Sequence, residues 1–375
     1  MSTQVVIGMG FGDEGKGAVT EYLCSRNPGC TKVVRFSGGH QCGHKVVKGD
    51  LEHVFSNFGS GTLSGCPTYW TKHCTFEPVG FWKEYCLLKE KGISPKISVH
   101  PECPVTTIYD VYANRRSVEV EHGTTGTGFF RTKKRHLYDG VEFTVGDLFS
   151  GPPGLIEEGL RAVRNYFGVA DDLNTEPFLE ACANIRQLVG SEVLLSRHPL
   201  DFVHMVFEGS QGLLLDENIG EMPHCTPSDV TPQKVLDMFV WVDEVYLVSR
   251  VYQTRHGNGP LTNTHMPLQL SNTEKETNKV NTYQGEFRSS VLDIDLLRHA
   301  KKEGIDKIMP ATTKVNLVMT CADQVGAYKF TMGDSTHLFM DSDEFVRSVG
   351  GILGISGDLY VNTSPRSTTI RRIAK

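Results

Sequence analysis

A glycine-rich segment near the N-terminus combines a lysine with a carboxylate. Residues 8–17 read Gly-Met-Gly-Phe-Gly-Asp-Glu-Gly-Lys-Gly, and from Gly10 they match the pattern G-x-x-x-x-G-K. The segment follows an apolar run and precedes residues of helical periodicity, which is the context of a phosphate-binding loop. Glycines let backbone N–H groups close around phosphate oxygens, and Lys16 adds a positive charge. We expect this loop to bind nucleotide phosphates through Lys16, Gly12, Glu14, Gly15 and Gly17.

One position departs from the usual phosphate loop. Gly17 stands where a Ser or Thr hydroxyl normally holds Mg²⁺, so the metal needs another oxygen ligand. Asp13 lies inside the loop, and a carboxylate buried among phosphates is unfavourable unless a metal ion or a substrate proton compensates its charge. The chemistry therefore centres on Asp13.

A second glycine-rich loop carries two histidines. Residues 35–45 read Arg-Phe-Ser-Gly-Gly-His-Gln-Cys-Gly-His-Lys and follow another apolar run. His40 and His44 are four residues apart, as metal ligands on a helix would be, but the glycines indicate a loop. Either histidine alone could be structural. A histidine presented beside a phosphate site is a candidate general acid.

The segments that we expect to position these loops alternate between two kinds of sequence pattern, one typical of strands and one typical of helices. Short Val- and Ile-rich runs predict buried strands, and the stretches between them have helical spacing. Strands alternating with helices predict an α/β fold with a large, mostly parallel central sheet and helices on both faces. Ligands of such folds bind beyond the carboxyl ends of the strands. The predicted strands are 4–9, 32–36, 203–207, 244–251, 307–311 and 359–363; the predicted helices are 16–25, 80–89, 154–167, 176–189, 232–242 and 290–302.

Composition excludes several classes of protein. The 375 residues carry a net charge of −6, which argues against a nucleic-acid-binding scaffold. No apolar run is long enough to span a membrane, and we expect no signal peptide, because no basic region and no small-residue cleavage site accompany the apolar run that begins at residue 5. Ten cysteines without a C-x-x-C pattern are typical of free thiols in a reducing cytoplasm, that of the host if the source is viral. We expect one domain over 1–375, with an insertion-rich region at about 60–200.

The two loops together resemble adenylosuccinate synthetase, whose signature is W-G-D-E-G-K-G followed by G-G-H-N-A-G-H. Further matches follow in the family's order over residues 4–260 and, more weakly, to 366. They are G-T-T-G-T-G at 123–128, F-E-G-S-Q-G at 207–212 with L-D at 215–216, P-H-C-T at 223–226, and T-R-H-G-N-G-P at 254–260.

This resemblance implies a ligase that condenses a purine nucleoside monophosphate with L-aspartate at the expense of a nucleoside triphosphate. Asp13 would take the N1 proton of the 6-oxopurine and bind Mg²⁺, and the carbonyl of Gly43 would complete the metal shell. His44 would donate a proton as the 6-oxygen attacks the γ-phosphate. Lys16 would stabilise the phosphates.

The resemblance also implies the remaining contacts. Family residues that hold the nucleotides match Gln41, Thr124, Thr125, Gln211, Thr226, Ser364 and Pro365. In the family an arginine reaches across a homodimer interface to the substrate phosphate, and Arg135 is the candidate here; the alternative is a solvated basic loop.

Two departures from the family bear on the substrates. The family's T-K-L-D, whose aspartate reads guanine, is matched to residues 313–316, so Lys314 would be retained and Asn316 would replace the aspartate, favouring ATP or dATP over GTP. In the arginine-rich amino-acid loop, Gln284, Gly285 and Arg288 remain candidates, whereas Glu286 occupies a position where arginine is expected.

These departures and the short chain resemble the phage branch that acts on dGMP to make 2-aminoadenine precursors. Asp13, which some members of that branch replace by serine, favours IMP instead. We expect dGMP, with the ordinary IMP- and GTP-using enzyme as the alternative. Two less favoured alternatives are a P-loop kinase or GTPase and a catalytically inactive nucleotide sensor.

Overall fold

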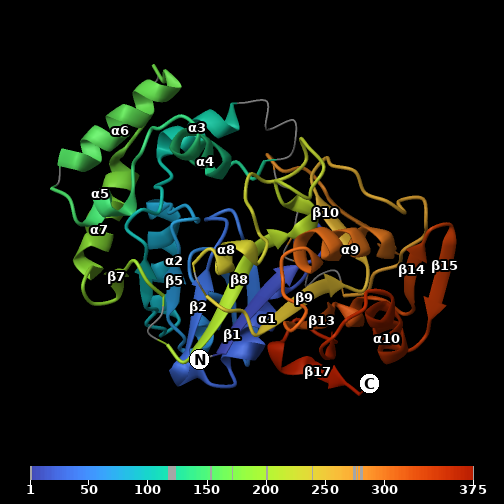
Figure 1. Ribbon diagram of the computed structural model, residues 1–375. Helices are drawn as coiled ribbons and strands as arrows, with labels where there is room; N and C mark the ends of the chain where they lie inside the picture. The colour runs from blue at the N-terminus through green and yellow to red at the C-terminus, as the bar shows by residue number, and fades with distance from the viewer. Residues whose placement is uncertain are drawn as a thin grey trace.

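The computed structural model describes residues 2–116, 124–152, 154–170, 172–199, 202–238, 240–272, 276, 278 and 282–374 (Figure 1). Gly123, the first residue of the G-T-T-G segment, lies outside this description.

One ten-stranded sheet runs through the molecule. In spatial order it contains β17 (Ile370–Ile373), β16 (Leu359–Asn362), β13 (Lys314–Thr320), β9 (Glu244–Arg250), β1 (Ser2–Gly8), β8 (His204–Gly212), β2 (Thr31–Arg35), β5 (Thr68–Trp70), β6 (Ile97–Val99) and β7 (Val193–Leu195). Every neighbouring pair is parallel except β16 with β17. The carboxyl ends of the parallel strands therefore meet along one edge, as the sequence predicted.

Smaller sheets and helices surround this core. The additional strands are β3 (His44–Lys48) with β4 (Leu51–Phe55), β10 (Gln253–His256) with β11 (Phe287–Ser290), and β12 (Leu292–Asp293) with β14 (Tyr328–Met332) and β15 (Ser335–Phe339). The helices are α1 (Lys16–Cys24), α2 (Pro78–Glu90), α3 (Ile108–Arg115), α4 (Phe129–Leu137), α5 (Val145–Phe149), α6 (Gly154–Phe167), α7 (Glu176–Leu188), α8 (Gln233–Leu236), α9 (Ile294–Lys301) and α10 (Ser342–Ile352), and short 3₁₀ turns include η2 (Ser60–Ser64), η4 (Leu213–Leu215) and η7 (Ala322–Gln324).

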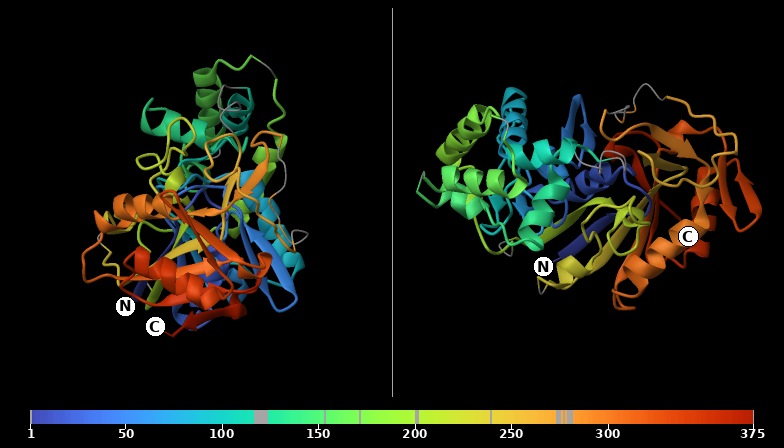
Figure 2. Two further views of the ribbon diagram at one scale, coloured as in Figure 1. Left: turned by 90° about the vertical axis from the view of Figure 1, so that its right-hand side faces the viewer. Right: turned by 90° about the horizontal axis from the view of Figure 1, so that it is seen from above.

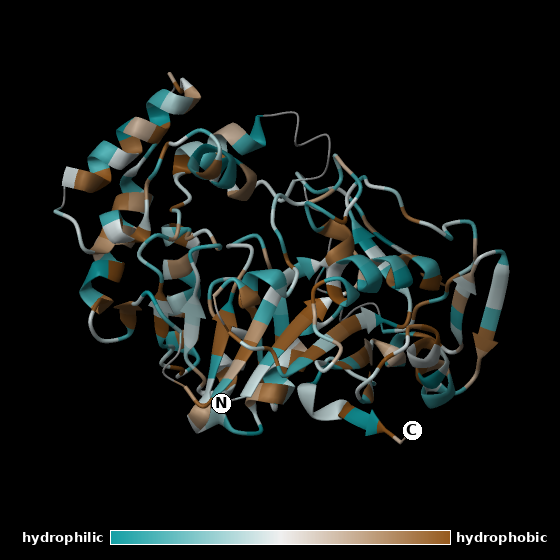
Figure 3. Ribbon diagram, in the orientation of Figure 1, coloured by the Kyte–Doolittle hydropathy of each residue, from teal (hydrophilic) through white to brown (hydrophobic). Residues whose placement is uncertain are grey.

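The central strands are covered on both faces, which explains their continuous apolar runs. Val5, Val6 and Ile7 of β1 are fully buried, and Figure 3 shows the hydrophobic colour concentrated in the middle strands. Strands buried on both faces lose the alternation of polar and apolar residues. Helices α2 to α7 gather beside one end of the sheet, and α9, α10 and β14–β15 lie towards the other (Figures 1 and 2).

The predicted fold class is confirmed, and five of the six predicted strands and four of the six predicted helices match observed elements closely. The predicted strand at 307–311 is wrong: these residues form turns after a π-helical segment, and the strand begins at Lys314. Pro310, which has no N–H to donate to a neighbouring strand, lies in the predicted stretch.

Two predicted helices are shorter than expected. The helix at 232–242 is reduced to α8, with residue 239 outside the description. The helix at 290–302 begins only at Ile294, because Asp293 caps it by accepting the N–H groups of Asp295 and Leu296. No helix among the described residues is both long enough and apolar enough to cross a bilayer.

Arg135 does not have the role predicted for it. It lies on α4 with no exposed surface, and its guanidinium donates to both carboxylate oxygens of Asp110, at 2.7 and 3.1 Å. It also donates to the carbonyls of Val105 and Val141. An arginine committed to four buried acceptors joins α3 to α4 and cannot reach a second subunit, so the assignment of Arg135 to a substrate phosphate in trans is wrong.

We predict that Arg135→Ala lowers the free energy of unfolding by about 3–5 kcal/mol, because it leaves the buried Asp110 carboxylate without its partner. Chemical denaturation measures the change. Lys134→Ala, an exposed neighbour on the same helix, is the control and should change stability by no more than about 0.5 kcal/mol. Equal effects of the two variants would contradict the structural role.

Candidate active site

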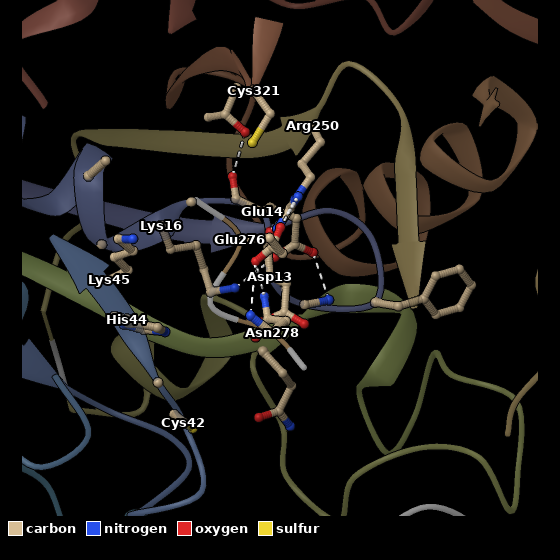
Figure 4. A pocket seen from close by; sticks show the side chains of 18 of the residues that line it. Asp13, Glu14, Lys16, Cys42, His44, Lys45, Arg250, Glu276, Asn278 and Cys321 are labelled. Atoms are coloured by element: carbon tan, nitrogen blue, oxygen red, sulfur yellow. Dashed lines mark hydrogen bonds and ion pairs between the residues drawn. The ribbon is translucent and has the colours of Figure 1, made fainter. Parts of the chain in front are cut away.

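A cavity lies at the carboxyl edge of the sheet and brings together most of the predicted residues. It is lined by the phosphate loop after β1, the loop after β2, and the ends of β8, β9, β13 and β16. Figure 4 looks into it: Asp13 and Lys16 enter from the phosphate loop, His44 from one side and Arg250 from another. The lining includes Gly12, Asp13, Glu14, Gly15, Lys16, Gly17, Gln41, Gly43, His44, Thr125, Gln211, Thr226, Gln284, Ser364 and Pro365.

The phosphate loop contains three residues in the left-handed backbone region. Gly12 and Gly15 have φ values of 88° and 86°, which glycine adopts without cost. Asp13 has a φ of 60°, an uncommon conformation for a residue with a side chain, which costs of order 1–3 kcal/mol. Such strain persists only where surrounding contacts enforce it, so Asp13 is held by its environment.

Glu14 fills the interior of this loop. Its carboxylate accepts the N–H groups of Gly10 and Gly12, at 3.0 and 2.9 Å, and pairs with the Lys16 ammonium at 2.7 Å. A Cβ atom at Gly8 or Gly212 would come within 2.3 Å of it, so both positions must be glycine. Glu14 thus lines the cavity with its carboxylate engaged as an internal anion, and its contact with a phosphate stays a prediction.

Asp13 is the carboxylate that faces the cavity. Burial raises its pKa above the usual value, and the positive charge of Arg250 opposes that shift. A carboxylate that gains a proton more readily than usual suits a proton acceptor.

His44 is fixed between two acceptors. Its Nδ1 lies 2.7 Å from Oε1 of Glu208, and its Nε2 lies 3.1 Å from the carbonyl oxygen of Ser210. These two contacts fix the orientation of the ring. Although Glu208 is fully buried, His44, Arg35 and the Ser60 hydroxyl lower its pKa to about 2, so it remains ionised.

The predicted magnesium ligands fit the ion. Asp13 and Gly43 lie on opposite loops of one cavity, and they offer a carboxylate and a backbone carbonyl. Mg²⁺ prefers oxygen ligands and usually takes one or two protein carboxylates together with phosphates and water. The described residues contain no cluster of three or more His, Cys, Asp or Glu side chains suited to a metal, so any Mg²⁺ here would depend on nucleotide oxygens.

A second cavity adjoins the first and shares several residues with it. Gln41, Thr125, Thr226 and Gln284 line both, and Thr124 lines the second only. Gln211, on β8, lines the first, where its neighbour Ser210 donates to its side-chain oxygen at 2.6 Å. The predicted nucleotide-binding hydroxyls and amides therefore border one continuous space.

Lys314 and Asn316 are not part of this space, which corrects their assignment to the triphosphate base. Asn316 is fully buried, donates to Glu244 at 2.8 Å and accepts the N–H of Asp358. Lys314 pairs with Asp358 at 2.7 Å. Both lie early in β13, and Asn316 precedes the carboxyl end at Thr320 by four residues, or about 13 Å of strand.

The carboxylate that the sequence analysis missed is Asp323. It lines the cavity in η7, directly after β13, together with Thr320 and Cys321 and near Asn362 of β16. Residues 320–323 read Thr-Cys-Ala-Asp, which also fits a T-x-x-D pattern. The correct start of β13 would have found it, because only residues beyond the strand's carboxyl end reach the ligand side.

Only part of the predicted amino-acid-binding loop lines the cavities. Gln284 lines both cavities, whereas Gly285 and Arg288 line neither. Arg288 donates instead to the carbonyls of Gly257 and Gly259, and Glu286 is exposed.

Arg255, which the sequence analysis did not single out, lines the second cavity. It donates to the carbonyls of Pro260 and His224, both at 2.7 Å. Burial and the nearby charge of Arg288 lower its pKa to about 10. In the described part of the chain, neither arginine forms a salt bridge with a carboxylate, although Glu221 and Glu286 are near enough to act on the pKa values of Arg255 and Arg288.

Comparisons with known proteins identify the family and the fold of the chain. The sequence profile of adenylosuccinate synthetase matches residues 5–329. Adenylosuccinate synthetase of Thermodesulfovibrio yellowstonii is 28% identical over 342 residues, covering 80% of this chain and 74% of the relative. That of Psychrobacter cryohalolentis is 29% identical over 278 residues, covering 68% of this chain and 63% of the relative. The chain thus matches just under two thirds of the length of some relatives.

Two solved structures share the fold. A fully ligated adenylosuccinate synthetase from Plasmodium falciparum aligns over the whole of both chains with a TM-score of 0.75 and 15% identity. A succinoaminodeoxyadenylate synthetase of cyanophage S-2L, bound to dGMP and to dATP as energy donor, aligns over all of this chain and 96% of its own, with a TM-score of 0.66 and 17% identity. The match of the family profile over most of the chain identifies a C–N bond-forming ligase. The chain belongs to the adenylosuccinate synthetase family.

We predict that Glu208→Gln weakens the protein in a pH-dependent manner. The folded pKa of Glu208 is about 2, below the unfolded value of about 4.3, so its ionisation stabilises the fold above about pH 4.3, and the contribution disappears as the pH falls towards 2. The stability difference between wild type and variant in urea should therefore be large at pH 7 and shrink below pH 4. A difference that stays constant with pH would contradict the assignment.

Proposed function

We propose that the protein phosphorylates the 6-oxo group of a purine nucleoside 5′-monophosphate and condenses it with L-aspartate, releasing nucleoside diphosphate and phosphate. The observation that carries the proposal is the convergence of Asp13, Lys16 and His44 on one cavity. A 6-oxo group is a poor leaving group, and phosphorylation converts it into a good one. The protein's task is then to position the reactants and stabilise charge.

Each side chain has a definite task in this scheme. Asp13 accepts the N1 proton, which makes the 6-oxygen nucleophilic. His44, whose Nδ1 is held by Glu208, would exchange the contact of its Nε2 with the Ser210 carbonyl for one with the oxygen that develops charge. Lys16 neutralises phosphate charge. Asp13 and the Gly43 carbonyl would hold Mg²⁺, which supplies further charge neutralisation on the transferred phosphate.

For the monophosphate we propose dGMP. Asp13, which by itself favours IMP, is compatible with dGMP, because its carboxylate has two oxygens that can accept from N1–H and from the adjacent 2-amino group side by side. Glu286, where the resemblance expects an arginine near the ribose 2′-hydroxyl, fits a 2′-deoxy substrate. The cyanophage structure with dGMP supports the proposal, since it shares this fold.

For the donor, the structure replaces Asn316 by Asp323 as the base-reading candidate, so the argument for ATP or dATP no longer holds. A carboxylate accepts from both N1–H and the 2-amino group of guanine, whereas adenine offers one amino donor beside an acceptor nitrogen. We therefore propose a guanine nucleotide as the donor.

For the amino acid, Arg255 and Arg288 supply the positive charge that a dicarboxylate requires. Both now donate to neutral backbone carbonyls, and the pKa of Arg255 is lowered by its burial and, secondarily, by the charge of Arg288. Aspartate carboxylates would offset these charges. A homodimer remains a prediction, but Arg135 no longer supports it.

A substrate matrix tests the reaction. Purified protein with Mg²⁺ is incubated with IMP, GMP, dGMP or dIMP, with ATP, dATP or GTP, and with aspartate or glycine, and the products are read by mass spectrometry. We expect a nucleotide that carries an added succinyl-amino group, together with free phosphate, from dGMP and aspartate. Asp13→Ala, Lys16→Ala and His44→Ala should each lower turnover at least about a hundredfold. A phosphorylated monophosphate as product would identify a kinase, and preference for IMP would overturn the dGMP proposal.

Asp323→Asn tests the donor. Loss of a bidentate acceptor for guanine should lower the ratio of kcat/KM for GTP to that for ATP by about tenfold to a hundredfold. Asp334→Asn, an exposed aspartate in the turn between β14 and β15, is the control and should leave the ratio unchanged. A wild-type enzyme that already prefers ATP, or a ratio unaffected by Asp323→Asn, would contradict the proposal.

A further inference from the structure

Two side chains from neighbouring strands donate hydrogen bonds to the part of the phosphate loop that contains the strained residue Asp13. Arg250, the last residue of β9, donates from Nε to the carbonyl of Asp13 at 2.6 Å. Thr320, the last residue of β13, donates from Oγ1 to the carbonyl of Glu14 at 2.7 Å. Both side chains are buried. Two consecutive carbonyls of the loop are therefore each fixed by a side chain from a different strand.

The pairing of the strands explains why these contacts match. Arg250 and Thr320 are register partners in the parallel β9–β13 ladder. Register partners point to the same face of a sheet and stand about 4.8 Å apart, close to the 3.8 Å between consecutive Cα atoms. The pairing therefore brings both side chains to the same place under the loop, where each meets a different one of the two consecutive carbonyls.

Both contacts are themselves held in place. The guanidinium of Arg250 also donates to the hydroxyl of Tyr252 at 2.7 Å and to Glu276 at 2.8 Å. Thr320 packs so closely under the loop that a Cβ atom at Gly15 would lie 3.4 Å from its methyl group. If the loop relaxed, these contacts would keep both side chains from moving with it.

We propose that Arg250 and Thr320 are positioning residues, which turn the Asp13 and Glu14 carbonyls towards the sheet and so direct the Asp13 carboxylate and the loop amides into the cavity. The left-handed conformation of Asp13 is what this arrangement enforces. The inference rests on the proposed role of Asp13 in the reaction, but its effect on triphosphate binding does not depend on that reaction.

The test uses Thr320→Val, which keeps the shape of the side chain and removes only the donor. We expect kcat to fall by about tenfold to a hundredfold, because small displacements of a reacting group cost that much. The KM values for monophosphate and aspartate should change less than about twofold, and Thr320→Ser, which restores the hydroxyl, should recover most of kcat. Arg250→Lys should behave like Thr320→Val, since an ammonium cannot occupy the Nε position while keeping the other two contacts.

Binding provides an independent measurement. The Kd of the Mg²⁺ complex of a non-hydrolysable guanosine triphosphate analogue, measured by calorimetry, should rise at least about threefold in Thr320→Val and remain near wild type in Thr320→Ser. Ser249→Ala is the matched control, because its hydroxyl donates to the Arg250 carbonyl at 3.0 Å and not to the loop. Failure of the wild type in the substrate matrix would refute the proposed function alone, since the binding comparison would still stand.

Two results would overturn the inference. One is a Thr320→Val protein with kcat and Kd within twofold of wild type. The other is equal impairment of Thr320→Val and Thr320→Ser with a matching fall in melting temperature, which would show a general structural role.

Discussion

The position of β1 in the middle of the sheet, hydrogen-bonded to β8 on one side and β9 on the other, governs the whole active site. Parallel pairing on both sides brings the phosphate loop into contact with the ends of its neighbours. From β8 come Glu208, Ser210 and Gln211, and from β9 comes Arg250. Residues far apart in sequence therefore meet because their strands share one direction, and the loops between elements can vary without disturbing this meeting.

The site contains several buried carboxylates, and each is compensated by different partners. Glu208 is compensated by His44 and Arg35, and Glu14 by Lys16 and two loop amides. Asp13 has no such complete compensation, which is why burial raises its pKa. Fully satisfied carboxylates build the scaffold, and the incompletely satisfied one is left for substrate and metal.

Much of this could be predicted from the sequence, and the exceptions have physical causes. Asp13, Lys16 and His44 were found because they lie in or directly after glycine-rich loops that follow strands, Lys16 as the first residue of α1 and His44 as the first residue of β3. Asn316 was misassigned because the short pattern T-K-x-[DN] does not show where β13 begins, and the strand start decides which residues reach the ligand side. Arg135 was misassigned because a basic run does not reveal that one member faces Asp110.

The carboxylate of Glu14 inside the phosphate loop has a consequence for the end of the catalytic cycle. Two amide dipoles and an ammonium that would otherwise attract phosphate are already partly neutralised by a tethered anion. A single inorganic phosphate meets a weaker field than a bare glycine loop would exert, whereas a triphosphate has further contacts along its length. In the proposed reaction, such a loop would hold inorganic phosphate less tightly than the triphosphate from which it derives.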